Sequence, residues 1–177
     1  MNLPNAITLA RILMVPAFIV LGYGDSDALA YAAFLVFFVA SVSDLVDGYL
    51  ARKNGSISKT GEFLDPLADK LLIGSALIVL VATRDFPLWA AIVIGVREVA
   101  VQLLRTRVVS TGGRLPASRG AKAKTVVQLC MVSWWVLPSD SRNFMHWGWL
   151  FLALAVTLYT GASYFAAARA PAAEVAT

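Results

Sequence analysis

Long apolar stretches alternate with short polar ones along this chain, and each apolar stretch is about as long as a membrane-spanning helix. A helix needs about 20 mostly apolar residues to cross the hydrocarbon core of a bilayer, with a range of roughly 17 to 25. Turn-forming residues such as Gly, Asp, Ser and Pro separate the stretches. The pattern therefore predicts six transmembrane helices, over residues 7–22, 28–49, 62–83, 87–108, 121–137 and 144–167.

Composition supports this prediction. Of the 177 residues, 59% are hydrophobic and 15% are charged, so an all-α integral membrane protein is the favoured class. We expect one six-helix membrane domain over residues 1–170, followed by a short flexible tail over 171–177. The sole cysteine, Cys130, lies in an apolar run, which excludes a disulfide framework and a cysteine-based metal site.

A signal peptide is an alternative for the first apolar stretch, because Arg11 precedes a run of about the right length. The residues before Arg11 are themselves mostly apolar, and no clear cleavage site follows at residues 22–27. We therefore interpret this stretch as the first spanning helix.

Basic residues predict the orientation of the six helices. Arg84 and Arg142 are the basic residues between helices 3 and 4 and between helices 5 and 6. The opposite side holds Arg52, Lys53, Lys59, Arg105, Arg107, Arg114, Arg119, Lys122 and Lys124. Positive residues favour the cytoplasmic side, so both termini and the loop between helices 2 and 3 are expected there. The net charge of +4 has the same explanation, and no nucleic-acid partner is expected.

Four aspartates gather where helix 2 ends and helix 3 begins. Asp44 and Asp47 are three residues apart, and Asp65 and Asp69 are four apart, so each pair shares one helical face. Clustered carboxylates repel one another unless a cation compensates. Hard oxygen ligands suit Mg²⁺ or Mn²⁺, and two such ions form the usual clamp for phosphoryl displacement. The pattern predicts a two-ion site, with solvated carboxylates paired to nearby Lys and Arg as the alternative.

The spacing of this stretch has a known counterpart. The pattern Asp44-x2-Asp47-Gly48-x2-Ala51-Arg52-x8-Gly61-x3-Asp65-x3-Asp69 resembles the signature of the CDP-alcohol phosphotransferase family. The resemblance implies that Asp44, Asp47 and Asp65 are the principal metal ligands. It also implies that Asp69 completes the metal site and acts as the general base. Gly48, Ala51, Arg52 and Gly61 would line the CDP pocket.

Basic residues further along the chain are candidates for binding a phosphate on the acceptor alcohol. Arg97 and Glu98 interrupt helix 4, Arg105 lies two turns further on, and Lys122 and Lys124 open helix 5. An ionisable residue within a bilayer is a functional hypothesis by default. The alternative for Arg97 and Glu98 is that each pairs with a structural partner, and the alternative for Lys122 and Lys124 is a role in topology.

Within the family, the chain is most similar to bacterial phosphatidylglycerophosphate synthases. The similarity rests on these positions and on residues 5–11 and 63–70. That similarity implies transfer of a phosphatidyl group from CDP-diacylglycerol to sn-glycerol 3-phosphate, at the cytoplasmic face of the inner membrane. Asn5 and Thr8 would then contribute to the CDP site and Arg11 to the acceptor phosphate site, with a cap of the first helix as the alternative for Asn5. A homodimer is also implied. The loop containing Gly112 and Gly113 could reshape the acceptor pocket.

Several alternatives remain open from the sequence. A sibling enzyme could use inositol phosphate, serine or phosphatidylglycerol as acceptor. An intramembrane prenyltransferase is disfavoured because its aspartate motifs are expected in two distant segments. A cation transporter is disfavoured by the lack of an inverted repeat and by the placement of all four aspartates at one end. A structural scaffold has no need of the signature.

Overall fold

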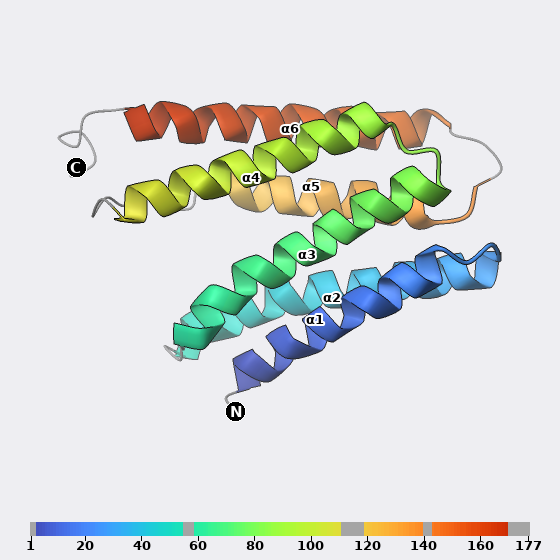
Figure 1. The fold of residues 1–177 in the computed structure, drawn as a ribbon, viewed down its shortest axis with the longest axis horizontal. Helices are drawn as coiled ribbons and strands as arrows, with labels where there is room; N and C mark the ends of the chain where they lie inside the picture. The colour runs from blue at the N-terminus through green and yellow to red at the C-terminus, as the bar shows by residue number, and fades with distance from the viewer. Residues whose placement is uncertain (1–2, 55–58, 111–118, 140–142, 170–177) are drawn as a thin grey trace. The chain divides into compact units, whose positions relative to one another are not determined.

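Six helices in the order α1 to α6 make up the described part of this computed structural model (Figure 1). The structure describes residues 3–54, 59–110, 119–139 and 143–169. Within those ranges it describes no side chains for residues 3–6, 44–54, 59–66, 109, 119, 121–122 and 169. The described residues contain no strand, so the prediction of an all-α chain is confirmed. The expected tail at 171–177 lies outside them.

The helices match the predicted segments closely and extend beyond them at the polar ends. Their bounds are Leu3–Gly22 (α1), Asp27–Asn54 (α2), Lys59–Thr83 (α3), Leu88–Ser110 (α4), Arg119–Val136 (α5) and Phe144–Arg169 (α6). The largest difference is in α2, which continues for five residues past the predicted end. Ala, Arg and Lys at positions 51–53 favour a helix, and a helix does not have to stop where its apolar part ends.

Side-chain caps are described at the starts of α2 and α6. Ser26 precedes α2, and its hydroxyl oxygen accepts a hydrogen bond of 3.3 Å from the backbone N–H of Leu29. Asn143 precedes α6, and its Oδ1 accepts from the backbone N–H groups of Met145 and His146 at 3.0 and 3.4 Å. Ser and Asn are preferred at this position because the first N–H groups of a helix have no partner within it.

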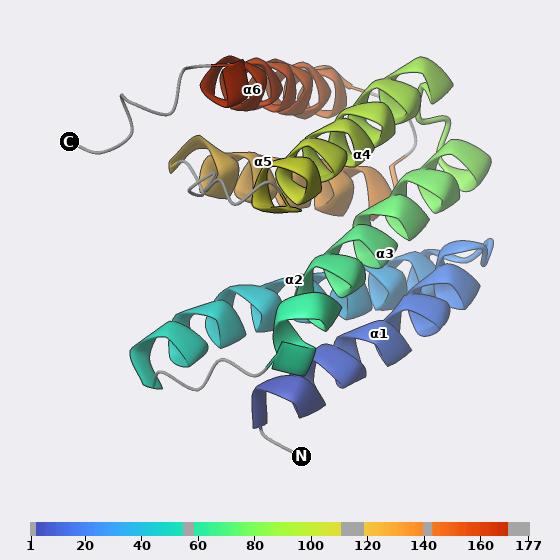
Figure 2. The same ribbon diagram turned by 60° about the vertical axis from the view of Figure 1, so that its left-hand side comes forward.

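The chain divides into two compact units. The first comprises residues 1–87 and 132–142, and the second comprises residues 88–131 and 143–177. In the first unit α1 packs against both α2 and α3, as Figures 1 and 2 show. The side of α2 that is buried carries Ala30, Ala33, Phe37 and Ala40, spaced three or four residues apart. This spacing forms a single helical stripe, and small residues allow close helix packing.

Aromatic and glycine contacts complete the core of the first unit. The rings of Phe18 on α1 and Phe37 on α2 are both fully buried, with centroids 5.5 Å apart. At the end of α1, a Cβ on Gly22 would lie 2.6 Å from Cγ1 of Val79, so α1 and α3 approach closely there because Gly22 has no side chain.

The end of α3 has an unusual backbone. Asp85 has φ of 51°, in the left-handed region. The backbone N–H of Phe86 donates to the carbonyl of Leu80, six residues back, at 3.3 Å. This reversal buries Phe86, whose ring meets that of Trp135 edge to face with centroids 4.8 Å apart. Asp is one of the few side chains besides glycine that adopts this conformation readily.

In the second unit α4 lies beside α6, as Figures 1 and 2 both show. Apolar side chains such as Ile94 on α4 and Leu150 and Ala153 on α6 are fully buried. Polar side chains are also withdrawn from solvent here, including Lys124, Gln128, Thr157 and Thr160. These polar residues belong to the candidate site described below.

Large apolar side chains are exposed on every helix, for example Val20 (74%), Leu35 (57%), Ile78 (64%) and Leu103 (63%). Exposure of this extent is typical of a surface that meets lipid or a partner. Among the described residues one helix, Phe144–Ala168, is long and apolar enough to cross a membrane, and Ile7–Gly22 and Asp27–Ser43 are shorter apolar helices. The six helices are thus confirmed, while their spanning of a bilayer stays a prediction.

Candidate active site

The four aspartates of the signature all lie on helical backbone. Asp44 and Asp47 are within α2, and Asp65 and Asp69 are within the first half of α3. An α-helix repeats every 3.6 residues, so each pair is about one turn apart along its helix. The four residues thus lie on helical backbone, whereas the side chains of Asp44, Asp47 and Asp65 lie outside the described ones, so the metal site stays a prediction.

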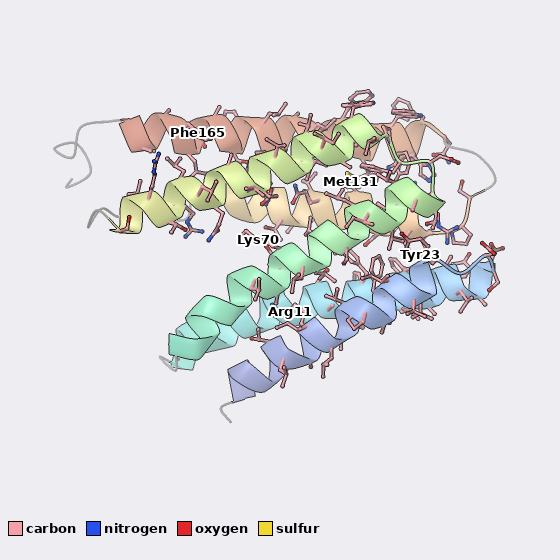
Figure 3. The ribbon with its side chains drawn as sticks, in the orientation of Figure 1. Arg11, Tyr23, Lys70, Met131 and Phe165 are labelled. Carbon is pink, nitrogen blue, oxygen red and sulfur yellow. The ribbon has the colours of Figure 1, made fainter. Side chains whose placement is uncertain are left out.

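Asp69 is the signature aspartate whose side chain is described. It is partly exposed, while its neighbour Ala68 is fully buried in the first unit. Lys70, marked on α3 in Figure 3, is also partly exposed. A general base has to be reachable by the proton that it accepts, and the accessibility of Asp69 fits that role.

The residues predicted to line the CDP pocket lie on the helices of the first unit. Gly48, Ala51 and Arg52 belong to α2, Gly61 to α3 and Asn5 to α1. Their side chains are outside the described ones, so their proposed contacts stay predictions.

Thr8 and Arg11 are described, and both are almost completely buried on α1. They are three residues apart and so share one side of the helix, on which Figure 3 marks Arg11. A buried guanidinium is costly unless polar or charged groups compensate it. The roles of the two residues in substrate binding stay predictions.

In the second unit the structure brings together two of the predicted phosphate-binding residues. Arg97 on α4 and Lys124 on α5 both donate to the same carboxylate oxygen, Oε1 of Glu98, at 3.1 and 2.8 Å. The side chains of Arg97 and Lys124 are 9% and 10% exposed, and that of Glu98 is 20% exposed. Two cations that meet at one anion leave the group with an excess positive charge, which suits an anionic ligand.

Helix α6 contributes two threonines to this group. The Nε of Arg97 donates to the backbone carbonyl of Thr157 at 3.0 Å, and its Nη2 donates to the hydroxyl of Thr160 at 2.7 Å. On α5, the Nε2 of Gln128 donates to the hydroxyl of Thr157 at 3.1 Å. We call Arg97, Glu98, Lys124, Gln128, Thr157 and Thr160 the polar network.

The other predicted acceptor residues are not part of the contacts described for the polar network. Arg105 is exposed on α4, eight residues beyond Arg97, which is about 12 Å along a helix. The side chain of Lys122 lies outside the described ones, and so does the loop with Gly112 and Gly113. Of the predicted basic pocket, the structure therefore brings together Arg97 and Lys124, with Glu98 between them.

Sequence reasoning missed the contribution of α6. It also did not predict that Glu98 and Gln128 would join the group. One signal was present, since Thr160 and Gly161 stand three and four residues after Thr157 in a mostly apolar helix. Two buried hydroxyls on one face of such a helix indicate a polar partner on a neighbouring helix.

Comparison with known proteins identifies the class of enzyme that has this motif on two adjacent helices. Residues 1–160 match the family described as CDP-alcohol phosphatidyltransferase, and the chain belongs to that family. The match includes the aspartate signature and every residue of the polar network, and it ends within α6.

Curated relatives of known name cover nearly the whole chain. A protein of Bacillus subtilis named CDP-diacylglycerol--glycerol-3-phosphate 3-phosphatidyltransferase is 41% identical over 180 residues, covering 93% of this chain and 93% of the relative. One of the same name from Rickettsia bellii is 36% identical over 173 residues, covering 95% and 96%. The "Probable phosphatidylglycerophosphate synthase" of Mycobacterium tuberculosis H37Rv is 40% identical over 171 residues, covering 94% and 81%.

Proposed function

We propose that this chain is a transferase of phospholipid biosynthesis that moves a phosphatidyl group from CDP-diacylglycerol to sn-glycerol 3-phosphate. The products are phosphatidylglycerophosphate and CMP. The observation that carries the proposal is the family match over residues 1–160, together with relatives of this named activity at 36–41% identity over nearly their full length. The intact aspartate signature on α2 and α3 supports it.

The donor set of the signature fits a hard divalent cation. Asp44, Asp47, Asp65 and Asp69 would hold two Mg²⁺ or Mn²⁺ ions, because these cations prefer carboxylate oxygens. Among the residues whose side chains are described, no group of three His, Cys, Asp or Glu could hold a metal ion. When bound, the ions would neutralise the charge that develops on the leaving CMP.

The chain's own residues bind the donor and move the proton. The small residues Gly48 and Ala51 would leave room beside α2 for the cytosine base, with Arg52 and Gly61 nearby in the sequence. Asp69 accepts the proton of the primary hydroxyl of glycerol 3-phosphate. That oxygen forms a bond to the phosphorus that carries diacylglycerol, the bond between this phosphorus and the CMP oxygen breaks, and CMP leaves with the electron pair.

The acceptor's own phosphate requires cations besides the metal. Arg97 and Lys124 are the described residues that fit this role best, because both are held close to one oxygen of Glu98 in a little-exposed environment. Arg11, Arg105 and Lys122 are further candidates by sequence. A guanidinium binds phosphate through two parallel hydrogen bonds, and an ammonium acts as a point charge.

We also propose that the chain is a multi-pass protein of the inner membrane, with six spanning helices, cytoplasmic termini and a homodimeric assembly. Exposed apolar side chains on all helices support lipid contact. Hydroxyl groups on α2 and α3 donate to carbonyls of their own helix, as from Ser41 to Phe37 and from Thr83 to Val79 at 2.8 Å. Such internal pairing is needed where no water is present.

The test is CMP release by the purified protein in detergent, with CDP-diacylglycerol and Mg²⁺. Glycerol 3-phosphate is compared with inositol phosphate, inositol, serine and phosphatidylglycerol, each with and without a chelator. We expect release with glycerol 3-phosphate alone, lost with chelator and restored by excess Mg²⁺. Release with a different acceptor would retain the aspartate chemistry and overturn the acceptor assignment. No release with any acceptor would overturn the proposal.

A further inference from the structure

One turn of α6 holds the guanidinium of Arg97 in a fixed orientation. The backbone carbonyl of Thr157 accepts from Nε at 3.0 Å, and the hydroxyl of Thr160 accepts from Nη2 at 2.7 Å. Both threonines are almost completely buried. Two acceptors on different nitrogens of one planar group fix both its position and the direction of its plane.

The same turn is shaped to receive this side chain. A Cβ added to Gly161 would lie 3.2 Å from both Cγ and Nε of Arg97, which is tighter than ordinary van der Waals contact. Arg97 therefore lies against the α6 backbone at Gly161 as well as between the two threonine acceptors. A methyl group at this position would push the guanidinium away from its acceptors.

Contacts continue from this turn to Lys124. The third guanidinium nitrogen of Arg97, Nη1, donates to Oε1 of Glu98, and Nζ of Lys124 donates to the same oxygen. Gln128 links Thr157 to Oε1 of Glu98 as well, through Nε2 contacts of 3.1 and 3.5 Å. The position of both cations thus depends on a turn of a helix that carries none of the signature residues.

We propose that the α6 turn of Thr157, Thr160 and Gly161 is a positioning site for Arg97 and, through Glu98, for Lys124, and that it determines the affinity for the acceptor's phosphate. This inference rests on the proposed function, in which these two cations bind that phosphate. Binding a phosphate with a pre-oriented guanidinium avoids the entropy loss of ordering a flexible side chain. The three α6 residues touch no substrate in this role, so they are positioning residues and not catalytic ones.

Two substitutions on α6 test the proposal. Thr160→Val removes the hydroxyl acceptor at nearly the same volume, and Gly161→Ala adds the methyl group against Arg97. Hydrogen bonds to charged groups contribute enough that we expect KM for glycerol 3-phosphate to rise about tenfold in each variant. We expect KM for CDP-diacylglycerol and kcat at saturating acceptor to stay within about twofold, because the groups that do the chemistry are unchanged.

Matched controls separate positioning from general damage to the fold. Thr160→Ser keeps the hydroxyl and is expected to keep the KM of the parent protein. Gly148→Ala adds a methyl group to the same helix where nothing lies within 4 Å of the added carbon, and it is expected to change neither KM. If Thr160→Val fails to fold, Gly161→Ala carries the test with Gly148→Ala as its control.

A comparison with glycerol, which lacks the phosphate, tests the mechanism directly. The preference for glycerol 3-phosphate over glycerol, as a ratio of kcat/KM, is expected to fall about tenfold in Thr160→Val and Gly161→Ala. Equal losses with both acceptors, or an unchanged KM for glycerol 3-phosphate, would overturn the positioning proposal. If Lys124→Met raises that KM while the α6 variants do not, the proposed function stands and the positioning site fails. If the parent protein does not use glycerol 3-phosphate, the proposed function itself fails.

Discussion

The aspartate signature and the polar network differ in how the chain brings their residues together. The signature occupies 26 consecutive positions at the junction of two sequential helices. The polar network draws its members from α4, α5 and α6, and Arg97 and Thr160 are 63 residues apart. The aspartate signature can therefore be recognised from the spacing of its residues, whereas the polar network forms only when three helices pack together. Chemistry that depends on neighbouring residues can be read from a sequence, and chemistry that depends on helix packing needs the structure.

The two units also differ in the contacts that join their helices. The first unit has close apolar contacts, such as Phe18 against Phe37 and Gly22 against Val79. The second adds charged and hydroxyl groups that bond from helix to helix. Substitutions in the aspartate signature should therefore lower turnover. Substitutions in the polar network should lower stability and the affinity for the acceptor.

The largest effect is expected from the signature. Asp69→Asn keeps an oxygen that can contact metal but removes the proton acceptor. We expect kcat for CMP release to fall by about 10²–10⁴-fold, the usual contribution of a general base. Binding of Mn²⁺, measured by electron paramagnetic resonance of the purified protein, should be largely retained.

The control for this prediction is Asp25→Asn, in the exposed turn between α1 and α2. It makes the same chemical change away from the signature and should leave turnover within about twofold. Substantial activity in Asp69→Asn would refute the assignment of Asp69 as the base.

A smaller effect, on stability, is expected from the polar network. Glu98→Gln removes the anion that Arg97 and Lys124 share, while its amide oxygen can still accept one hydrogen bond. Because loss of one partner leaves buried cations uncompensated, we expect about 2 kcal/mol of destabilisation. Thermal unfolding in detergent should show a Tm lowered by about 4–8 °C.

A double variant tests whether uncompensated positive charge causes the loss of stability in Glu98→Gln. Adding Lys124→Met to Glu98→Gln removes one of the two uncompensated cations. The double variant should then be less destabilised than the two single effects together. Additive losses would mean that Glu98 does not compensate Lys124.

The smallest effect concerns apolar packing in the first unit. Gly22→Ala places a methyl group 2.6 Å from Cγ1 of Val79, a buried side chain that is stiff at its first torsion. We expect about 1–2 kcal/mol of destabilisation from this overpacking. Gly74→Ala on α3 meets nothing within 4 Å and should be neutral or stabilising by up to about 1 kcal/mol. The two variants are compared by their midpoints of chemical denaturation in mixed micelles. Equal midpoints would contradict the close approach of α1 and α3.

The order and approximate bounds of all six helices followed from apolar stretches, because runs of apolar residues and turn-forming breaks are local properties. Extension of α2 to Asn54 could not be predicted from apolar length, since a polar turn can continue a helix. Besides Arg11, Arg105 and Lys122, the sequence predicted Arg97 and Lys124 as phosphate-binding cations. Their shared partner Glu98 and the α6 acceptors Thr157 and Thr160 were not, because pairing across helices depends on rotation and register that spacing does not specify.

Asp85, at the reversal after α3, limits what evolution or protein engineering can place there. A side chain with φ of 51° must tolerate contact between its β-carbon and the neighbouring carbonyl oxygen. Asn and Gly tolerate it about as well as Asp does, whereas Val or Ile would be strained by roughly 1–3 kcal/mol. A library of variants selected for activity should therefore return Asp, Asn and Gly at position 85. Judged by its exposure alone, position 85 would accept almost any side chain. Its left-handed backbone conformation is what limits the choice.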